Sequence, residues 1–136
     1  MKYLLDYFQQ NDQLATHLGI KLLKVSTGYA KAEMEIQDFH LNSVRVVHGG
    51  AIFTLADFVF AVASNSYGKI AMAINVNINF IKPAIKGKIY AEAEEVANHP
   101  KLGTYQVTVK DENDDLIAIF QGVAYRKRQD LPDWTY

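Results

Sequence analysis

One acidic side chain, Asp57, lies within a long apolar segment of the sequence that runs from Ala51 to Ala63. Burying a carboxylate without a partner is costly, so the fold must give this side chain a hydrogen-bond donor or an opening to solvent. The pattern alone leaves two interpretations. Asp57 accepts hydrogen bonds from the backbone or a neighbouring subunit, or it faces a substrate cleft as a general base or nucleophile, with a pKa raised by its apolar surroundings.

Two glycines, Gly49 and Gly50, stand directly before this segment. At the start of a helix, the first backbone N–H groups lack intrahelical acceptors and lie at the positive end of the helix dipole. Without side chains to cover them they form a candidate oxyanion hole, and Asp57 lies about two helical turns further along the same face. The alternative is steric, because two glycines also let the chain turn tightly against its neighbours.

Two polar residues upstream are candidates to complete such a site. His48 directly precedes the glycines, but no serine or cysteine nucleophile accompanies it, so the sequence favours a structural role in which the imidazole bonds to the loop backbone. Asn42 could direct its amide into the same cleft, yet an asparagine in a loop commonly caps the loop itself. The sequence favours this loop role for Asn42.

The remaining residue types do not predict a metal centre. His17, His40 and His99 are scattered and lack the spacing of metal ligands. The chain contains no cysteine, which excludes disulfides, thiolate ligands and cysteine nucleophiles. We therefore expect no metal centre.

The overall composition limits the class of protein. With 136 residues, of which 49% are hydrophobic, the chain is long enough for one domain with one core. A formal net charge of -1 offers no basic field for nucleic acid. The N-terminal residues lack the pattern of a signal peptide and the longest apolar segment is too short to span a bilayer, so we expect a cytoplasmic protein with no membrane partner.

The elements that must position the candidate residues follow from the hydrophobic periodicity. Residues 3–18 have helical spacing interrupted at Asn11 and Asp12, which predicts two short amphipathic helices. Residues 51–66 are apolar around the whole circumference of a helix, so other structure must wrap this helix. Alternation with period two predicts strands elsewhere. The predicted strands are 20–25, 29–36, 71–82, 88–96, 104–111 and 116–127.

The arrangement of these elements can also be predicted. Short connections after the helix indicate that consecutive strands pair antiparallel. A curved antiparallel sheet around the long helix buries it most simply, which predicts an α+β domain over 1–136, with its core at about 12–127 and a loosely held tail at 129–136. The last strand is apolar on both faces and free sheet edges invite pairing, so we expect at least a homodimer.

Four short motifs together resemble the PaaI-like branch, of the phenylacetate-pathway type, of the hotdog-fold acyl-CoA thioesterases. They are Leu41-Asn42, His48-Gly49-Gly50, Leu55-Ala56-Asp57 and Asn79-Phe80-Ile81-Lys82-Pro83-Ala84. The resemblance extends over about residues 12 to 127, and its specificity lies in the joint spacing, since His-Gly-Gly alone is a weak motif. It implies a hotdog fold and hydrolysis of an acyl-CoA without a metal or cofactor.

The resemblance also implies roles for individual residues. Asp57 is the catalytic carboxylate, which directs water at the thioester carbonyl or attacks that carbonyl itself. The Gly49 N–H is the oxyanion donor, Asn42 positions the water or the thioester, and His48 and Gly50 support them. Active sites of this family lie at the dimer interface, which implies a homodimer, or a pair of dimers, in which the Asp57 and Gly49 of one site come from different chains.

Further residues are expected to support or bind the substrate. Some relatives hold the water with a serine or threonine early in the strand after the helix, and Asn75 is the nearest polar substitute here. An aryl or medium-chain acyl group is expected against Phe53 and Phe60, or their counterparts across the interface. The phosphates of coenzyme A need cations. Available cations are Lys82, Lys86, Lys88, Lys101, Arg126, Lys127 and Arg128, with Lys82, Lys88 and Arg126 preferred.

Two other functions fit the same fold. One is a non-hydrolytic module that binds acyl-CoA or acyl-carrier protein, although the presence of Asp57 counts against it. The other is a dehydratase of hydroxyacyl thioesters, which needs a histidine paired with a separate acid, whereas the context of His48 favours hydrolysis.

Overall fold

The computed structural model describes residues 1–132 and contains the predicted helices and strands. The helices are α1 (Lys2–Asn11), α2 (Gln13–Leu18) and α3 (Gly49–Asn65), with a short 3-10 helix, η1 (Asp38–His40). The strands are β1 (Lys21–Ser26), β2 (Tyr29–Glu35), β3 (Lys69–Phe80), β4 (Lys88–Asn98), β5 (Leu102–Asp111) and β6 (Leu116–Asp130).

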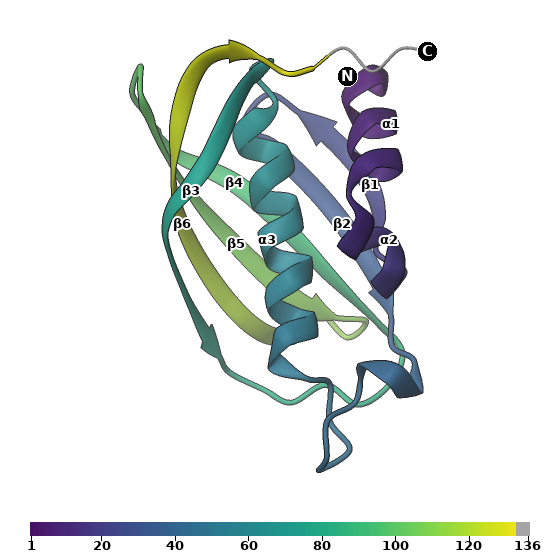
Figure 1. Ribbon diagram of the computed structural model, residues 1–136. Helices are drawn as coiled ribbons and strands as arrows, with labels where there is room; N and C mark the ends of the chain where they lie inside the picture. Colours follow the sequence, from purple (N-terminus) through teal and green to yellow (C-terminus); the bar gives the residue numbers. More distant parts are fainter. Residues whose placement is uncertain (133–136) are drawn as a thin grey trace.

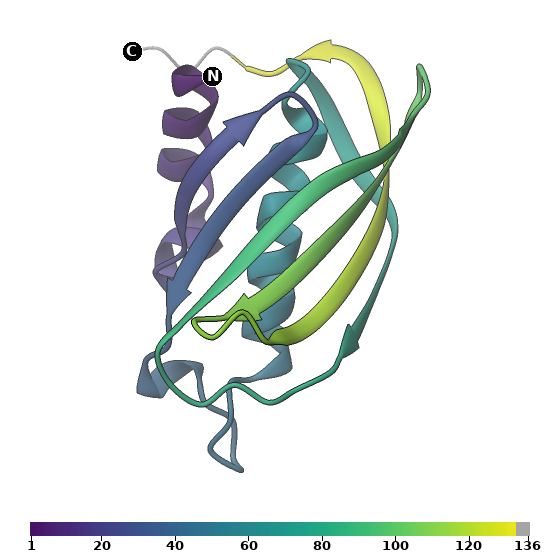
Figure 2. The ribbon, with the colours of Figure 1, turned by 180° about the vertical axis from the view of Figure 1, so that it is seen from behind.

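The six strands form one antiparallel sheet in the order β1-β2-β4-β5-β6-β3. The sheet curves around α3, which contacts all six strands, while α1 and α2 lie beside β1 (Figure 1). Seen from behind, the opposite face of the sheet is not covered by any helix of residues 1–132 (Figure 2). This arrangement confirms the predicted α+β class and the sheet wrapped around one long helix.

The prediction that consecutive strands pair is wrong at β3. This strand pairs with β6, from Lys69 opposite Asp130 to Phe80 opposite Ala118, whereas β4 pairs with β2 and β5. The segment between β3 and β4 crosses from one edge of the sheet to its interior. Turn residues reveal that a chain changes direction, but they do not reveal which strand it joins. The apolar faces of β6 therefore reflect an interior strand, and the sheet edges are β1 and β3.

The core is built by the packing of α3 onto the sheet. The ring of Phe60 is 1% exposed and packs against Tyr105 and Phe120, at centroid distances of 5.7 and 5.6 Å. Gly122 lies beneath this ring, where an added Cβ would approach a Phe60 ring carbon to 2.7 Å. A glycine at this point of β6 thus allows the helix to lie close to the sheet.

The predicted loose tail is wrong for its first two residues. β6 continues through Gln129 and Asp130, the Asp130 carboxylate pairs with Lys69, and the Leu131 N–H donates to the Gly68 carbonyl. Residues 133–136 of that prediction lie outside the described residues. No helix within residues 1–132 has both the length and the apolar character needed to cross a membrane.

Candidate active site

Asp57 lies on the side of α3 that its neighbours leave partly open. Phe53, Thr54, Asp57 and Ala61 are half-buried, whereas the other residues between Ala51 and Asn65 are buried. The spacing of these four residues puts them on one face of the helix, and we call them the open stripe. The helix is therefore wrapped on most of its circumference, and the only acidic residue of α3 lies where the wrapping stops.

The Asp57 carboxylate has no hydrogen-bond donor and no ion-pair partner among residues 1–132. Burial raises its pKa above the ordinary value, and the Asp12 carboxylate raises it further. Asp12 is the N-cap of α2, where it accepts a hydrogen bond of 3.0 Å from the Ala15 N–H. Within the described part of one chain, no group therefore fulfils the structural role considered for Asp57. Sequence reasoning missed Asp12, because only the docking of α2 against α3 relates the two acids.

Gly49, the first residue of α3, presents a backbone N–H that has no acceptor among the described residues. The neighbouring Gly50 N–H is already engaged, because it donates to His48 Nδ1 at 2.8 Å. His48 is the N-cap, so the predicted structural role is confirmed. Since Nδ1 accepts a hydrogen bond, the neutral imidazole carries its proton on Nε2. The available donor at this helix start is therefore Gly49, and Gly50 contributes by shaping the turn.

The loop before α3 is organised by Asn42. Its side-chain Oδ1 accepts hydrogen bonds from the Val44 N–H at 3.0 Å and the Val46 N–H at 3.3 Å, and its backbone N–H donates to the Val46 carbonyl. Arg45 closes this tight loop with a φ of 67°. The predicted loop role of Asn42 is thus present. Its amide Nδ2 has no acceptor within residues 1–132 and is available for a second contact.

His40 is a positioning residue that the sequence did not single out. Its buried imidazole accepts from the Gln37 N–H at 2.9 Å through Nδ1 and bonds to the Leu18 carbonyl at 2.8 Å through Nε2. Its own carbonyl accepts from the His48 N–H at 2.7 Å. His40 therefore ties the loop before α3 to the end of α2. Its spacing from the other histidines carries no signal of this role, since its partners are backbone groups.

An apolar cavity of about 340 Å³ opens beside Gly49. An added Cβ at Gly49 would lie 3.2 Å from the Phe80 ring, so the glycine keeps the space beside the helix start clear. The cavity walls come from the loop, the first turn of α3 and the end of β3. They comprise Val46, Val47, Gly49, Ile52, Phe80, Ile81, Lys82 and Pro83. A carbonyl whose apolar substituent enters this cavity would lie near the free Gly49 N–H.

The two phenylalanines predicted to contact substrate differ in position. Phe53 belongs to the open stripe and packs edge-on against Phe120 at 5.5 Å. Phe60 is a core residue beneath the helix, where it lies against Gly122. Asn75, the predicted polar support, is exposed on the edge strand β3 next to a register shift. The structure thus leaves Phe53, but not Phe60, accessible from the open side of α3 in a single chain.

The three preferred cations for coenzyme A are separated in the structure. Lys82 bonds to two carboxylates, Asp111 at 3.1 Å and Asp115 at 2.7 Å. Lys88 lies 3.5 Å from Glu33 on the neighbouring strand. Arg126, near the far end of β6, donates to the backbone carbonyls of His99 and Pro100 in the turn between β4 and β5. These residues therefore do not form one phosphate site in a single chain.

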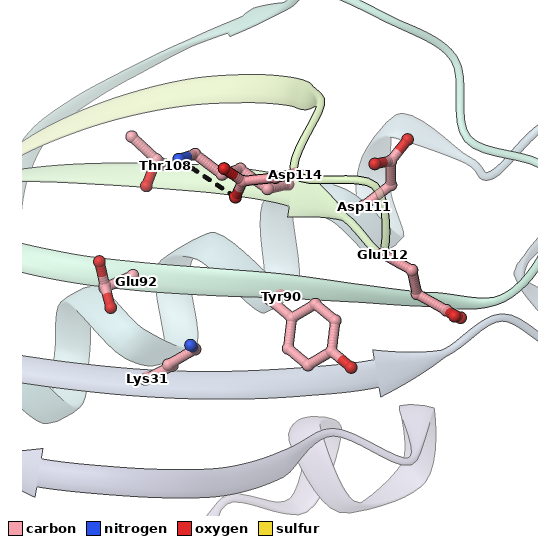
Figure 3. Close-up of a pocket in the computed structure, with 8 residues that line it drawn as sticks. Lys31, Tyr90, Glu92, Thr108, Asp111, Glu112 and Asp114 are labelled. Atoms are coloured by element: carbon pink, nitrogen blue, oxygen red, sulfur yellow. Dashed lines mark ion pairs between the residues drawn. The ribbon is translucent and has the colours of Figure 1, made fainter.

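A second cavity, of about 450 Å³, lies on the sheet face that α3 does not cover. Figure 3 shows its polar walls, in which Lys110 pairs with Asp114 and the Tyr90 ring lies among charged side chains. The Lys31 ammonium is 5.7 Å from the centre of that ring. The charged side chains that line this second cavity all interact with neighbouring groups, in contrast to Asp57. Among residues 1–132, no three histidine, aspartate or glutamate side chains are grouped to hold a metal ion.

Known proteins match both the sequence and the fold. The family described as the thioesterase superfamily matches residues 45–118. A putative esterase of Archaeoglobus fulgidus is 47% identical over 93% of this chain and 83% of its own length. The acyl-coenzyme A thioesterase PaaI of Escherichia coli is 32% identical over 86% of this chain and 84% of its own length. The solved structure of E. coli PaaI matches with a TM-score of 0.90 and covers 93% of each chain.

The chain therefore belongs to the thioesterase superfamily and has the hotdog fold of the PaaI-like thioesterases. It is a thioester hydrolase. The phenylacetic acid degradation protein PaaI of Thermus thermophilus, solved as a mutant, is a further structural match, with 34% identity and a TM-score of 0.82 over 85% of this chain and 100% of that one. The resemblance inferred from the four motifs is confirmed.

Proposed function

We propose that this protein is an acyl-CoA thioesterase that hydrolyses an aryl- or medium-chain acyl-CoA to the free acid and coenzyme A. The observation that carries the proposal is the half-buried, unpaired carboxylate of Asp57 on a helix whose first N–H, that of Gly49, is free. The similarity to E. coli PaaI, whose name is acyl-coenzyme A thioesterase, supports acyl-CoA as the substrate class.

In the proposed reaction, Asp57 acts on a water molecule next to the thioester carbonyl. The carboxylate accepts a proton as the water oxygen bonds to the carbonyl carbon, and its raised pKa makes it a better base than an ordinary aspartate. The Gly49 N–H stabilises the negative charge that develops on the carbonyl oxygen. The C–S bond then breaks, and the thiolate takes up the proton that Asp57 accepted. Direct attack by Asp57 is the alternative first step, and neither route uses a cofactor.

The surrounding residues fit this chemistry. The apolar cavity beside Gly49 suits the apolar part of the substrate, with Phe53 on the adjoining stripe as a further contact. The free amide Nδ2 of Asn42 is a donor that can orient the water or the thioester. His48 holds Gly50, so the amide of Gly49 is fixed in direction before the substrate arrives.

We further propose that each site is shared between two copies of the chain. Gly49 and Asp57 are eight residues apart, about 12 Å along the helix axis, whereas both must lie about 3 Å from neighbouring atoms of one reacting centre. A second copy can supply the missing partner. The edge strand β3 supports this arrangement, because Met72, Ile74 and Phe80 on or near its free edge are 53%, 60% and 55% exposed.

The experiment that tests the function is a thiol-release assay over a panel of acyl-CoA thioesters. The panel contains phenylacetyl-, hydroxybenzoyl-, short-, medium- and long-chain acyl-CoAs. We expect release of free coenzyme A, fastest with an aryl or medium-chain substrate. Binding of these thioesters without release of coenzyme A from any of them would overturn the proposal in favour of a non-hydrolytic binding module.

A further inference from the structure

A groove at the opposite end of α3 from Gly49 carries a concentrated positive charge. It lies where β3 begins, β6 ends and the turn between β4 and β5 projects (Figure 1), and it encloses about 630 Å³. We call it the basic groove. Five of its eight lining residues are cations and none is an acid, although the whole chain has 14 cations, 15 acids and a net charge of -1. The cations are Lys69, Lys101, Arg126, Lys127 and Arg128.

Arg126 holds the two walls of this groove together. Its guanidinium donates to the His99 carbonyl at 3.0 Å and lies 4.8 Å from the centre of the Tyr67 ring. The backbone N–H of Arg126 donates to the Lys101 carbonyl at 2.7 Å. The end of β6 is thus fastened to the β4–β5 turn, so the two backbone segments that carry the cations keep their relative positions before any ligand binds.

Three cations of the groove are free to bind an anion. Lys101, Lys127 and Arg128 are exposed and have no ion-pair partner among residues 1–132. Lys82 and Lys88, by contrast, are already bonded to carboxylates elsewhere. Because clustered cations without carboxylate partners favour ligands with several negative charges, the groove is suited to a compact group that carries more than one phosphate.

We propose that the basic groove binds the phosphorylated nucleotide end of the acyl-CoA substrate, an inference that rests on the proposed thioesterase function. The 3′-phosphate and the diphosphate of coenzyme A together supply the multiple negative charges that Lys101, Lys127 and Arg128 require. The exposed ring of Tyr125 on the same wall offers a surface on which the adenine can stack.

The distance between the basic groove and the open stripe matches the length of the arm that joins the thioester of acyl-CoA to its phosphates. Eight residues separate Asp57 from Asn65 at the end of α3, which is about 12 Å along the helix, and Lys69 follows shortly after. The pantetheine arm that joins the thioester to the diphosphate is comparable with four or five extended residues, or roughly 15 Å. A substrate whose thioester lies beside Asp57 can therefore place its phosphates at this end of the molecule.

The test uses the triple variant Lys101→Gln, Lys127→Gln and Arg128→Gln in the full chain. The triple variant Lys2→Gln, Lys21→Gln and Lys24→Gln is the matched control, since it removes the same charge from exposed positions outside the groove. For the acyl-CoA that the wild type hydrolyses, we expect the groove variant to raise KM by about tenfold and leave kcat within about twofold. The control variant should leave both constants within about twofold.

Two further probes separate the nucleotide from the thioester. The corresponding acyl-pantetheine lacks all phosphates, so wild type and groove variant should hydrolyse it with the same KM. Adenosine 3′,5′-bisphosphate carries phosphates without a thioester, and calorimetry should detect its binding to the wild type and about tenfold weaker binding to the groove variant. Added salt should weaken the wild-type complex more than that of the variant.

These measurements distinguish failure of the groove assignment from failure of the proposed function. If both triple variants raise KM for acyl-CoA equally, or if acyl-pantetheine is affected as strongly as acyl-CoA, the groove assignment is wrong while thioester hydrolysis stands. If no thioester is hydrolysed but the bisphosphate binds the wild type and not the groove variant, the groove binds nucleotide phosphates and the proposed function fails. Equal bisphosphate binding by wild type and groove variant also overturns the groove assignment.

Discussion

Two aspartates, Asp57 on α3 and Asp111 at the end of β5, have opposite surroundings in this fold, because one carboxylate has several hydrogen-bond donors and the other has none among the described residues. Asp111 accepts hydrogen bonds from the Asn113 and Asp115 N–H groups at 2.9 and 3.0 Å and from the Lys82 ammonium at 3.1 Å. Partial desolvation raises the pKa of Asp111, but the hydrogen bonds outweigh it and hold the pKa below its ordinary value. Asp57 has no such donors among the described residues, and its pKa is raised by burial and by Asp12.

The difference separates an acid that builds structure from one that is available for chemistry. The carboxylate of Asp111 stabilises the β5–β6 turn, and both of its oxygens already accept hydrogen bonds. The carboxylate of Asp57 is kept in a half-buried setting at a cost to stability, which is typical of functional sites. Substitutions at these two positions and at their neighbours therefore test this difference between the two acids.

The largest effect is expected from Asp57→Asn, which preserves the size of the side chain and removes the proposed base. We expect turnover of acyl-CoA to fall by about 10²–10⁴-fold, because proton transfer in the transition state is lost. The matched change Asp111→Asn should leave turnover within about threefold, since the Lys82 ammonium keeps Asp115 as a partner and the asparagine Oδ1 can still accept from the turn N–H groups. Similar losses in both variants, measured by thiol release on folded protein, would show that Asp57 has no special role.

The next effect concerns the proposed oxyanion donor, the backbone N–H that Gly49→Pro removes. Gly49 is the first residue of α3, a position that accepts proline, and His48 has the extended backbone, φ -57° and ψ 134°, that the residue before a proline requires. We expect kcat to fall by about 10²–10³-fold. Gly49→Ala is the control, because it adds a Cβ at the same place but keeps the N–H. Equal activities of the two variants would refute the role of the Gly49 amide.

Mixing these two inactive variants tests whether a site is shared. A dimer of one Asp57→Asn chain and one Gly49→Pro chain holds one site with neither change if the groups come from different chains. Random assortment should then restore about one quarter of the wild-type activity per chain, since half of the dimers are mixed and each has one intact site. No recovery after co-expression, despite mixed dimers isolated through two affinity tags, would place both groups in one chain.

A smaller effect is expected from Asp12→Asn. Asparagine can still cap α2 by accepting from Ala15, but it no longer repels charge on Asp57. The pKa of Asp57 should fall, so the acid limb of the kcat/KM profile should move to lower pH, and the plateau activity should fall slightly because the carboxylate becomes a weaker base. An acid limb at the same pH in wild type and variant would mean that Asp12 does not act on the ionisable group that limits the rate.

The smallest effects are opposite changes in stability. Asp57 has a raised pKa, so its ionisation costs stability as pH rises through that pKa, and the cost disappears below the unfolded value near 3.8. Asp57→Asn should therefore raise Tm at pH 7.5, on the order of 2 °C.

Asp111 has a lowered pKa, so its ionised carboxylate stabilises the folded state above pH 3.8. This stabilisation is lost as pH falls through the lowered pKa, so Asp111→Asn should lower Tm at pH 7.5. Thermal unfolding at pH 7.5 and pH 3.5 checks both signs, and changes of the same sign would contradict the comparison.

Several features of this protein were determined by the sequence itself. The period of the apolar residues set the helices and strands, because a helix and a half-buried strand repeat at different spacings. The apolar circumference of α3 required a wrapping sheet. The joint spacing of Asn42, His48-Gly49-Gly50, Asp57 and the strand that ends at Pro83 indicated the family. Each of these features depends on neighbouring residues or on a fixed number of residues between motifs, both of which can be read directly from the sequence.

Other features were decided only by the tertiary structure. The pairing of β3 with β6, the proximity of Asp12 to Asp57 and the anchoring of the loop by His40 join residues that are distant in sequence, so no local pattern contains them. The environment of each cation was also decided by the tertiary structure. Lys82 and Lys88 form ion pairs with carboxylates, whereas Lys101, Lys127 and Arg128 line one groove that contains no acidic residue. Charge is a property of each residue, but whether a charge is free depends on which groups the fold brings within bonding distance.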